Sequence, residues 1–217
     1  MRIIETYKSI QGEGTMAGEL TMFVRCSGCN IHCSWCDTVF SWDTQSGKMS
    51  KDMTVYEILQ VCLDAGVKNV CITGGEPVLQ KDLGELTILL KSRGFFVSVF
   101  TNGTLPLNNI FAVDNWVADY KLKSAKAEIP FRKENFLFLR NCDEIKFVVS
   151  SDEDLEEAKE VMSNAVTNAK FLISPCLDGK VDFEKAKKIA EKIIKENLKV
   201  RYSLQLHTVL WGSKRGV

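Results

Sequence analysis

The sequence lacks a net charge, a long apolar run and an internal repeat. Its 28 lysine and arginine residues balance its 28 aspartate and glutamate residues, so no excess of one sign favours nucleic acid or an acidic membrane as a partner. No apolar segment is long enough to span a bilayer, and the start of the chain does not resemble a signal peptide. We therefore expect a cytoplasmic protein that binds neither nucleic acid nor membranes.

The chain also lacks a linker and a low-complexity tract. Its 217 residues fit one large α/β unit, which predicts a single domain over residues 1–217. Cytosolic proteins keep their thiols reduced, so clustered cysteines there bind metals or react more often than they form disulfides. Cys62 and Cys71 stand apart from the cluster in apolar runs, and we expect them to be buried packing residues.

What the chain has is an alternation of two hydrophobic periods. Short β-branched or aromatic runs predict strands at 20–25, 68–73, 95–101, 115–120, 144–149 and 169–174. Segments with the helical period lie between several of them, at 54–66, 81–94, 152–165 and 182–197. Thr54 and Asp152 are typical N-caps, and Gly66 and Gly94 are typical C-terminal stops. Strands that alternate with helices predict βαβ units and a parallel sheet.

Short loops rich in turn-forming or polar residues follow five of the predicted strands. They are the cysteine-rich loop after 20–25, TGGEP (73–77), TNGT (101–104), DYKLKS (119–124) and SPCLDG (174–179). Turn formation alone explains any one of them. Because parallel α/β folds bind ligands at the carboxyl ends of their strands, five such loops at one edge favour a binding site there.

The stretch CSGCNIHCSWCDT (26–38) holds four of the cysteines. Thiolates are soft ligands that suit zinc or iron–sulfur clusters. Structural zinc usually takes its ligands from two knuckles that are well separated, whereas only three residues separate Cys26/Cys29 from Cys33/Cys36. An iron–sulfur cluster can be held by one compact loop. Four ligands would saturate such a cluster for electron transfer, and three would leave one iron open for chemistry.

The spacing Cys29-x3-Cys33-x2-Cys36, followed by TGGEP, resembles the radical S-adenosylmethionine (SAM) superfamily. The resemblance implies an α/β fold with a parallel-sheet partial (β/α) barrel of the radical SAM type, modified and abbreviated. It also implies that these three cysteines bind a 4Fe–4S cluster whose open iron chelates SAM. Cys26 falls outside the pattern, and we expect it to be a buried bystander.

Further motifs cover most of the chain and resemble the 7-carboxy-7-deazaguanine synthase family. They are SIQGEG (9–14), FVRCSGCN (23–30), CDT (36–38), TNGT (101–104) and the tail QLHTVLWGSKRGV (205–217). The resemblance implies conversion of 6-carboxy-5,6,7,8-tetrahydropterin to 7-carboxy-7-deazaguanine with loss of ammonia, in the biosynthesis of queuosine-type 7-deazapurines. A radical formed from SAM would abstract hydrogen from C6 of the pterin, and SAM would be regenerated. Mg²⁺, a homodimer and a low-potential electron donor such as flavodoxin are implied as well.

Residue by residue, the resemblance assigns contacts to substrate, SAM and metal. The substrate would be bound by Ile10, Gln11, Gly12, Glu13, Arg25, Thr73, Gln205 and His207. SAM would be contacted by Trp35, Cys36, Asp37, Gly75, Glu76, Asn102, Lys121, Ser174 and Pro175. Thr38 would bind Mg²⁺, which takes few protein ligands. Arg25 would grip the substrate carboxylate through its planar guanidinium, although an arginine that ends a strand commonly reaches the surface instead.

The chain departs from the family pattern in two loops. Many members have Ser-Pro-Lys where this chain has Asp119-Tyr120-Lys121, so only Lys121 carries over. Ser174 replaces a glutamine, so the loop position carries over without its hydrogen bonding. Gln205 and His207 alternate in VRYSLQLH, which predicts a late strand with both side chains on one face. A histidine on a strand is more often structural than catalytic.

Two other functions stay open on the sequence. A glycyl-radical activating enzyme shares the cysteine spacing but acts on a protein, and it would lack the QGEG and QLH segments. An electron-transfer module would hold a four-cysteine cluster through Cys26 and would never cleave SAM. Formation of the deazaguanine from the carboxypterin would exclude both of them.

Overall fold

The computed structural model describes residues 1–43, 49–177 and 182–217. Their strands are β1 (Arg2–Ile10), β2 (Leu20–Cys26), β3 (Lys51–Asp52), β4 (Asn69–Gly74), β5 (Phe96–Thr101), β6 (Asn115–Tyr120), β7 (Glu144–Val149), β8 (Lys170–Pro175) and β9 (Arg201–Tyr202). They form one sheet in the order β3-β1-β2-β4-β5-β6-β7-β8-β9. Among these described strands, β1 pairs antiparallel with β2 and β3, and the other pairs are parallel. The predicted parallel sheet is confirmed.

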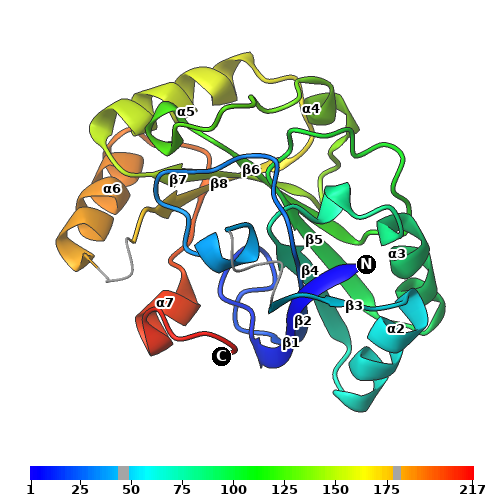
Figure 1. The fold of residues 1–217 in the computed structure, drawn as a ribbon. Helices are drawn as coiled ribbons and strands as arrows, with labels where there is room; N and C mark the ends of the chain where they lie inside the picture. The colour runs from blue at the N-terminus through cyan, green and yellow to red at the C-terminus, as the bar shows by residue number, and fades with distance from the viewer. Residues whose placement is uncertain (44–48, 178–181) are drawn as a thin grey trace.

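Helices cover the outer face of this curved sheet. The described α-helices are α2 (Val55–Asp64), α3 (Leu83–Ser92), α4 (Glu134–Phe138), α5 (Asp152–Asn164), α6 (Phe183–Lys195) and α7 (Leu206–Trp211). Figure 1 shows α2 to α6 along the outside of the arc, while α7 and the chain's C-terminus lie on its inner side. Because β3 and β9 end the strand order at opposite edges, the sheet stays open, as predicted for a partial barrel. No helix of the described residues has the length and apolarity to cross a membrane.

Local sequence signals explain most helix ends. Thr54 caps α2 through a capping box with Glu57, which satisfies two backbone donors at once. Gly66 and Gly94 follow α2 and α3 with φ of 66° and 81°, a left-handed conformation that glycine adopts without steric cost. The predicted N-cap at Asp152 is wrong by one residue: Ser151 is the cap, because its side chain accepts from Asp154 N.

The apolar core lies between the sheet and the outer helices. Val70 and Ile72 of β4 pack with Ile58 of α2 and with Leu86 and Leu90 of α3, and all five are fully buried. Successive side chains of a strand point to opposite faces, so residue 71 between them is directed to the inner side. The sheet therefore buries one face in the core and presents the other to the interior of the arc.

The predicted late strand through 205 and 207 is wrong. β9 ends at Tyr202, and Gln205 is instead the N-cap of α7, with His207 inside that helix. The chain leaves the sheet because Leu206 N donates to Gly12 O at 3.0 Å. This contact sets the start of α7 against the segment that follows β1, a tertiary interaction that the alternation in VRYSLQLH does not reveal.

Candidate functional site

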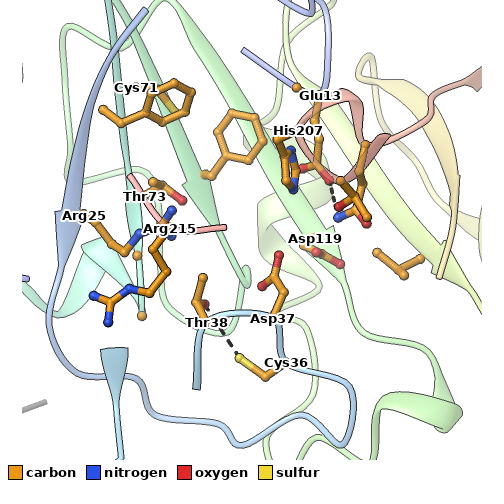
Figure 2. Close-up of a pocket in the computed structure, with 18 of the residues that line it drawn as sticks. Glu13, Arg25, Cys36, Asp37, Thr38, Cys71, Thr73, Asp119, His207 and Arg215 are labelled. Carbon is orange, nitrogen blue, oxygen red and sulfur yellow. Dashed lines mark hydrogen bonds between the residues drawn. The ribbon is translucent and has the colours of Figure 1, made fainter. Parts of the chain in front are cut away.

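A cavity of about 390 Å³ opens at the carboxyl ends of the parallel strands. Its wall includes the ends of β4, β5 and β6 and the segments that follow β1 and β8. The cysteine loop lines one side, and α7 with residues 212–217 lines another. The five loops that the sequence predicted at one edge therefore meet at one cavity, which Figure 2 shows in close-up.

Three of the four clustered cysteines face this cavity. Cys29, Cys33 and Cys36 line it as free, partly exposed thiols, whereas Cys26 is a fully buried member of the apolar core. Burial raises the pKa of the Cys26 thiol to about 12, which disfavours the thiolate that a metal needs. Cys26 therefore has the environment of the packing residue that the sequence predicted.

The three thiols fit an iron–sulfur cluster by their chemistry and placement. They are soft donors from one loop and open onto one space, as a compact cluster requires. Within the described residues, no group of three His, Cys, Asp or Glu side chains is arranged around a single metal ion. Burial raises the pKa of Cys29, and it raises that of Cys33 to about 11, so binding a cluster would release protons.

Backbone packing ties the TGGEP loop to the cysteine loop. A Cβ atom at Gly75 would lie 2.0 Å from the carbonyl oxygen of Gly28. Glu76 N donates to the same oxygen at 2.7 Å. The sequence interpretation gave Gly75 a role in admitting SAM. The structure adds a second reason for glycine, because the neighbouring backbone already occupies the space of a side chain.

Glu76 connects loops rather than lining the cavity. Its fully buried carboxylate accepts from Thr101 Oγ1 and from Asn102 N, both at 2.7 Å. Burial raises the pKa of Glu76, against the opposing effect of these hydrogen bonds. Asn102 does line the cavity, and its Nδ2 lies 3.7 Å from Cys29 Sγ. Asn102 is therefore the member of this pair that can reach a bound ligand.

Two guanidinium groups meet at one side of the cavity. Arg25 donates from Nε to Glu5 Oε1 and from Nη2 to the Tyr7 hydroxyl, both at 2.8 Å. Arg215 Nη2 lies 3.5 Å from Glu5 Oε2, and its guanidinium is 3.6 Å from the centroid of the Phe40 ring. One carboxylate thus faces two guanidinium groups. This set of side chains carries one excess positive charge, which suits an anionic ligand.

A row of buried and partly buried charges lies on the other side. Lys146 Nζ is 2.9 Å from Glu13 Oε2 and 3.2 Å from Asp119 Oδ2. Lys121 Nζ is 2.9 Å from the same Asp119 oxygen. Gln205 Nε2 donates to Glu13 Oε1 at 2.6 Å. Burial alone would raise the pKa of Glu13, but the charge of Lys146 and these hydrogen bonds outweigh it and lower the pKa to about 2.

The end of the cysteine loop and α7 complete the wall. Figure 2 shows Asp37 and Thr38 beside each other above Cys36, and Thr38 Oγ1 lies 3.7 Å from Cys36 Sγ. His207 packs against the backbone of Gly12, where a Cβ atom would be 2.3 Å from His207 Nδ1. A glycine at position 12 therefore lets α7 approach the segment after β1.

Most of the residues that the sequence assigned to a site line this one cavity. They are Ile10, Gln11, Gly12, Glu13, Arg25, Trp35, Cys36, Asp37, Thr38, Thr73, Gly75, Asn102, Lys121, Gln205 and His207. Ser174 and Pro175 do not, because β8 continues to Pro175 and both are buried in the sheet. Cys176 and Leu177 line the cavity in their place. Asp178 and Gly179 of the predicted SPCLDG loop lie outside the described residues.

Sequence reasoning missed several charged residues of the cavity, among them Glu5, Lys146 and Arg215. Lys146 interrupts the apolar run EIKFVV, and a lysine at the centre of a buried strand is a signal because lysine is rarely buried without a partner. Arg215 lies in the tail that carried the family resemblance, but nothing in the local pattern connects it with Glu5. Asp119, which the sequence left doubtful, links Lys121 to Lys146.

Known proteins resemble this chain in both sequence and fold. The model of the radical SAM superfamily matches residues 23–121. A 7-carboxy-7-deazaguanine synthase of Clostridium acetobutylicum is 36% identical over 228 residues, covering 100% of this chain and 99% of that protein. The synthase of Methanospirillum hungatei is 40% identical, covering 95% of this chain and 84% of that protein. The crystal structure of QueE from Escherichia coli matches 94% of this chain and 93% of that chain with a TM-score of 0.76 at 24% identity, which shows a common fold.

Proposed function

The chain belongs to the 7-carboxy-7-deazaguanine synthase family, and we propose that it converts 6-carboxy-5,6,7,8-tetrahydropterin to 7-carboxy-7-deazaguanine. The reaction is a radical SAM carbon–nitrogen lyase step in the biosynthesis of queuosine-type 7-deazapurines. Substrate and product differ by one ammonia, so no net oxidant or reductant is needed. One observation carries the proposal: a single cavity joins three free thiols to an arginine pair and a buried carboxylate.

The thiol side of the cavity would hold the cofactors. Cys29, Cys33 and Cys36 would bind the 4Fe–4S cluster, and SAM would lie against Gly75, Asn102 and the cysteine loop. When bound, these two groups supply the one-electron chemistry that starts the reaction, and the protein binds, orients and shields the reactants. Lys121 would face SAM with its ammonium 4.9 Å from the centroid of the Trp35 ring, a contact that holds the lysine in place.

The substrate would span the rest of the cavity. Arg25 and Arg215 offer paired N–H donors to the carboxylate of the pterin. Glu13 would accept from the N–H groups of the aminopyrimidinone ring, because an ionised carboxylate has about four acceptor sites and Lys146 and Gln205 use only two of them. Figure 2 shows Glu13 and His207 on the side opposite Arg25 and Arg215. All four line the same cavity, so we assign the two groups to opposite ends of one flat ligand.

Thr38 would contribute to a Mg²⁺ site between cofactor and substrate. A neutral hydroxyl is a weak single ligand, and Mg²⁺ keeps several waters and takes few protein ligands beside its substrate. The position of Thr38 beside Cys36 supports this assignment. Mg²⁺ should therefore bind well only when the carboxypterin is present.

We further propose a single domain that forms a homodimer in the cytoplasm. A low-potential donor such as flavodoxin would reduce the cluster. The homodimer and the electron donor rest on the family, whereas the single domain rests on the length of the chain and the location on its sequence. Size-exclusion chromatography tests the dimer, and turnover with reduced flavodoxin in place of dithionite tests the donor.

The activity is tested by anaerobic turnover. The reconstituted protein receives dithionite, SAM and Mg²⁺ with either the carboxypterin or its 6-carboxamide, and products are identified by mass. Deazaguanine should form from the acid and far more slowly from the amide, which lacks the anionic group. Cleavage of SAM without any deazaguanine would contradict the proposal and favour the glycyl-radical activating enzyme, and no cleavage at all would favour the electron-transfer module.

A further inference from the structure

Lys146 is a charged residue in the middle of a strand whose residues are all buried. Its side chain is only 8% exposed, and its ammonium contacts Glu13 and Asp119. The register of the sheet places Asp119 of β6 directly opposite Lys146 of β7. A buried ammonium is costly unless it is paired, so this lysine and its two carboxylate partners form one electrostatic unit.

The unit reaches from the cofactor side of the cavity to the substrate side. Lys121 stands over Trp35 of the cysteine loop and pairs with Asp119. Asp119 pairs with Lys146, and Lys146 pairs with Glu13. The four side chains of the row alternate in sign, two ammonium groups with two carboxylates. Lys146 is the only cation of the row in ion-pair contact with Glu13 among the described residues.

The same strand also holds the backbone beside Glu13. Residues 144 and 146 point to the same face of β7. Glu144 is fully buried and accepts from Thr15 N at 2.8 Å and from Thr15 Oγ1 at 2.9 Å. The segment after β1 is thus fastened to β7 through both its backbone and the Glu13 side chain, which leaves the carboxylate little freedom.

We propose that Lys146 is a positioning residue for the reaction, fixing the Glu13 carboxylate as the acceptor for the N–H groups of the pterin ring. This inference rests on the proposed function and deepens it. Lys146 acts through Glu13 and need not touch the substrate. A carboxylate that is already held in one orientation loses little conformational entropy when the ligand binds, so the interaction is not weakened by that cost.

The charges around Glu13 predict a pH signature for this role. Lys146 faces Glu13 from β7, His207 and Gln205 face it from α7, and Asp119 of β6 lies beyond Lys146. Removing the lysine charge leaves burial and a nearby carboxylate, which both favour the protonated form of Glu13. The pKa of Glu13 should then rise towards the assay range, and affinity for the pterin should fall as the pH is lowered.

The test compares Lys146→Met with wild-type holoenzyme. Methionine keeps a similar unbranched side chain without the charge. We measure kcat and KM for the carboxypterin, and the dissociation constant for SAM, from about pH 6 to about pH 9. The ratio of variant to wild-type KM should rise at least about tenfold at the acid end, while SAM affinity stays near normal. Lys146→Arg should recover part of the loss, and Lys188→Met, at an exposed lysine of α6, should behave as wild type.

A second variant keeps the test decisive if Lys146→Met does not fold. Glu13→Gln should cause a comparable loss of pterin affinity with normal SAM affinity and without a pH-dependent ratio. The double variant Glu13→Gln with Lys146→Met should lose little more pterin affinity than Glu13→Gln alone, because the effects of two residues that act through one contact are not additive. Equal loss of kcat, pterin affinity and SAM affinity at every pH, or no rise in KM, would overturn the inference. If wild-type protein makes no deazaguanine but still binds the pterin in a Lys146-dependent way, the proposed function fails and the positioning role survives.

Discussion

Replacing Gly75 by alanine should inactivate the site, because the added methyl group would collide with the backbone of the cysteine loop. The new Cβ atom would lie 2.0 Å from Gly28 O and 2.5 Å from Gly28 C. Both are backbone atoms, so no side-chain rotation can relieve the contact. The TGGEP loop and the cysteine loop must therefore separate by about 1 Å. The displacement falls on the residue before Cys29 and weakens the 2.7 Å hydrogen bond from Glu76 N to Gly28 O.

These distances predict a loss of both stability and catalytic rate. Overpacking of this kind destabilises a protein by about 1–3 kcal/mol, and a 1 Å misplacement of a reacting group can reduce the rate on the order of a hundredfold. We therefore expect Gly75→Ala to lower turnover by about two orders of magnitude and to retain less of the cluster. Turnover, the absorbance of the reconstituted 4Fe–4S cluster and urea unfolding measure the three effects.

Gly84→Ala is the matched control. Gly84 lies in α3, and a Cβ atom there would meet no other atom within 4 Å. Gly84 is in the first turn of the helix, and alanine is more favourable than glycine by at most roughly 1 kcal/mol, the value for a helix interior. This variant should therefore be at least as stable as wild type and equally active. If Gly75→Ala matched Gly84→Ala in rate and cluster content, the tight packing of the two loops would be refuted.

Three further predictions concern single side chains. Alanine at Cys29, Cys33 or Cys36 should abolish the cluster absorbance after anaerobic reconstitution, whereas Cys26→Ala should keep it; equal loss in all four would favour a four-cysteine cluster. Thr38→Ala should leave the cluster and SAM binding intact but lower turnover and its Mg²⁺ dependence about tenfold to a hundredfold, and an unchanged rate curve against Mg²⁺ would reduce Thr38 to a loop hydroxyl. The pKa of Glu13 is lowered from 4.5 to about 2, so its contribution to stability is complete above pH 4.5 and disappears as the pH falls towards 2. Urea unfolding should show this loss, on the order of 3 kcal/mol, in wild-type protein and not in Glu13→Gln; parallel curves for the two proteins would contradict it.

Local patterns predicted six of the nine described strands, β2 and β4 to β8, and the thiol side of the site. The six predicted strands are present with ends shifted by at most one residue, because buried parallel strands produce continuous apolar runs. Cys29, Cys33 and Cys36 face the cavity together because a short loop fixes them relative to one another. Thr54 was predictable as a cap because its partner is three residues away.

The substrate side depended on contacts between distant segments. Asp119 meets Lys146 only through the register of β6 and β7, and Arg215 meets Glu5 across most of the chain. α7 begins at Leu206 because its backbone bonds to Gly12, whereas the alternating sequence around it also fits a strand. Such pairings are set by the fold as a whole, so no local signal specifies them.

We propose that this cavity turns the carboxypterin into the deazaguanine with loss of one ammonia. 7-Carboxy-7-deazaguanine and ammonia are quantified together in one anaerobic reaction, with Cys33→Ala as the paired blank. We predict equal amounts of the two products from wild-type protein, far more of each than of SAM consumed, and neither from the blank. Ammonia without the deazaguanine, or the same products from Cys33→Ala, would contradict the claim.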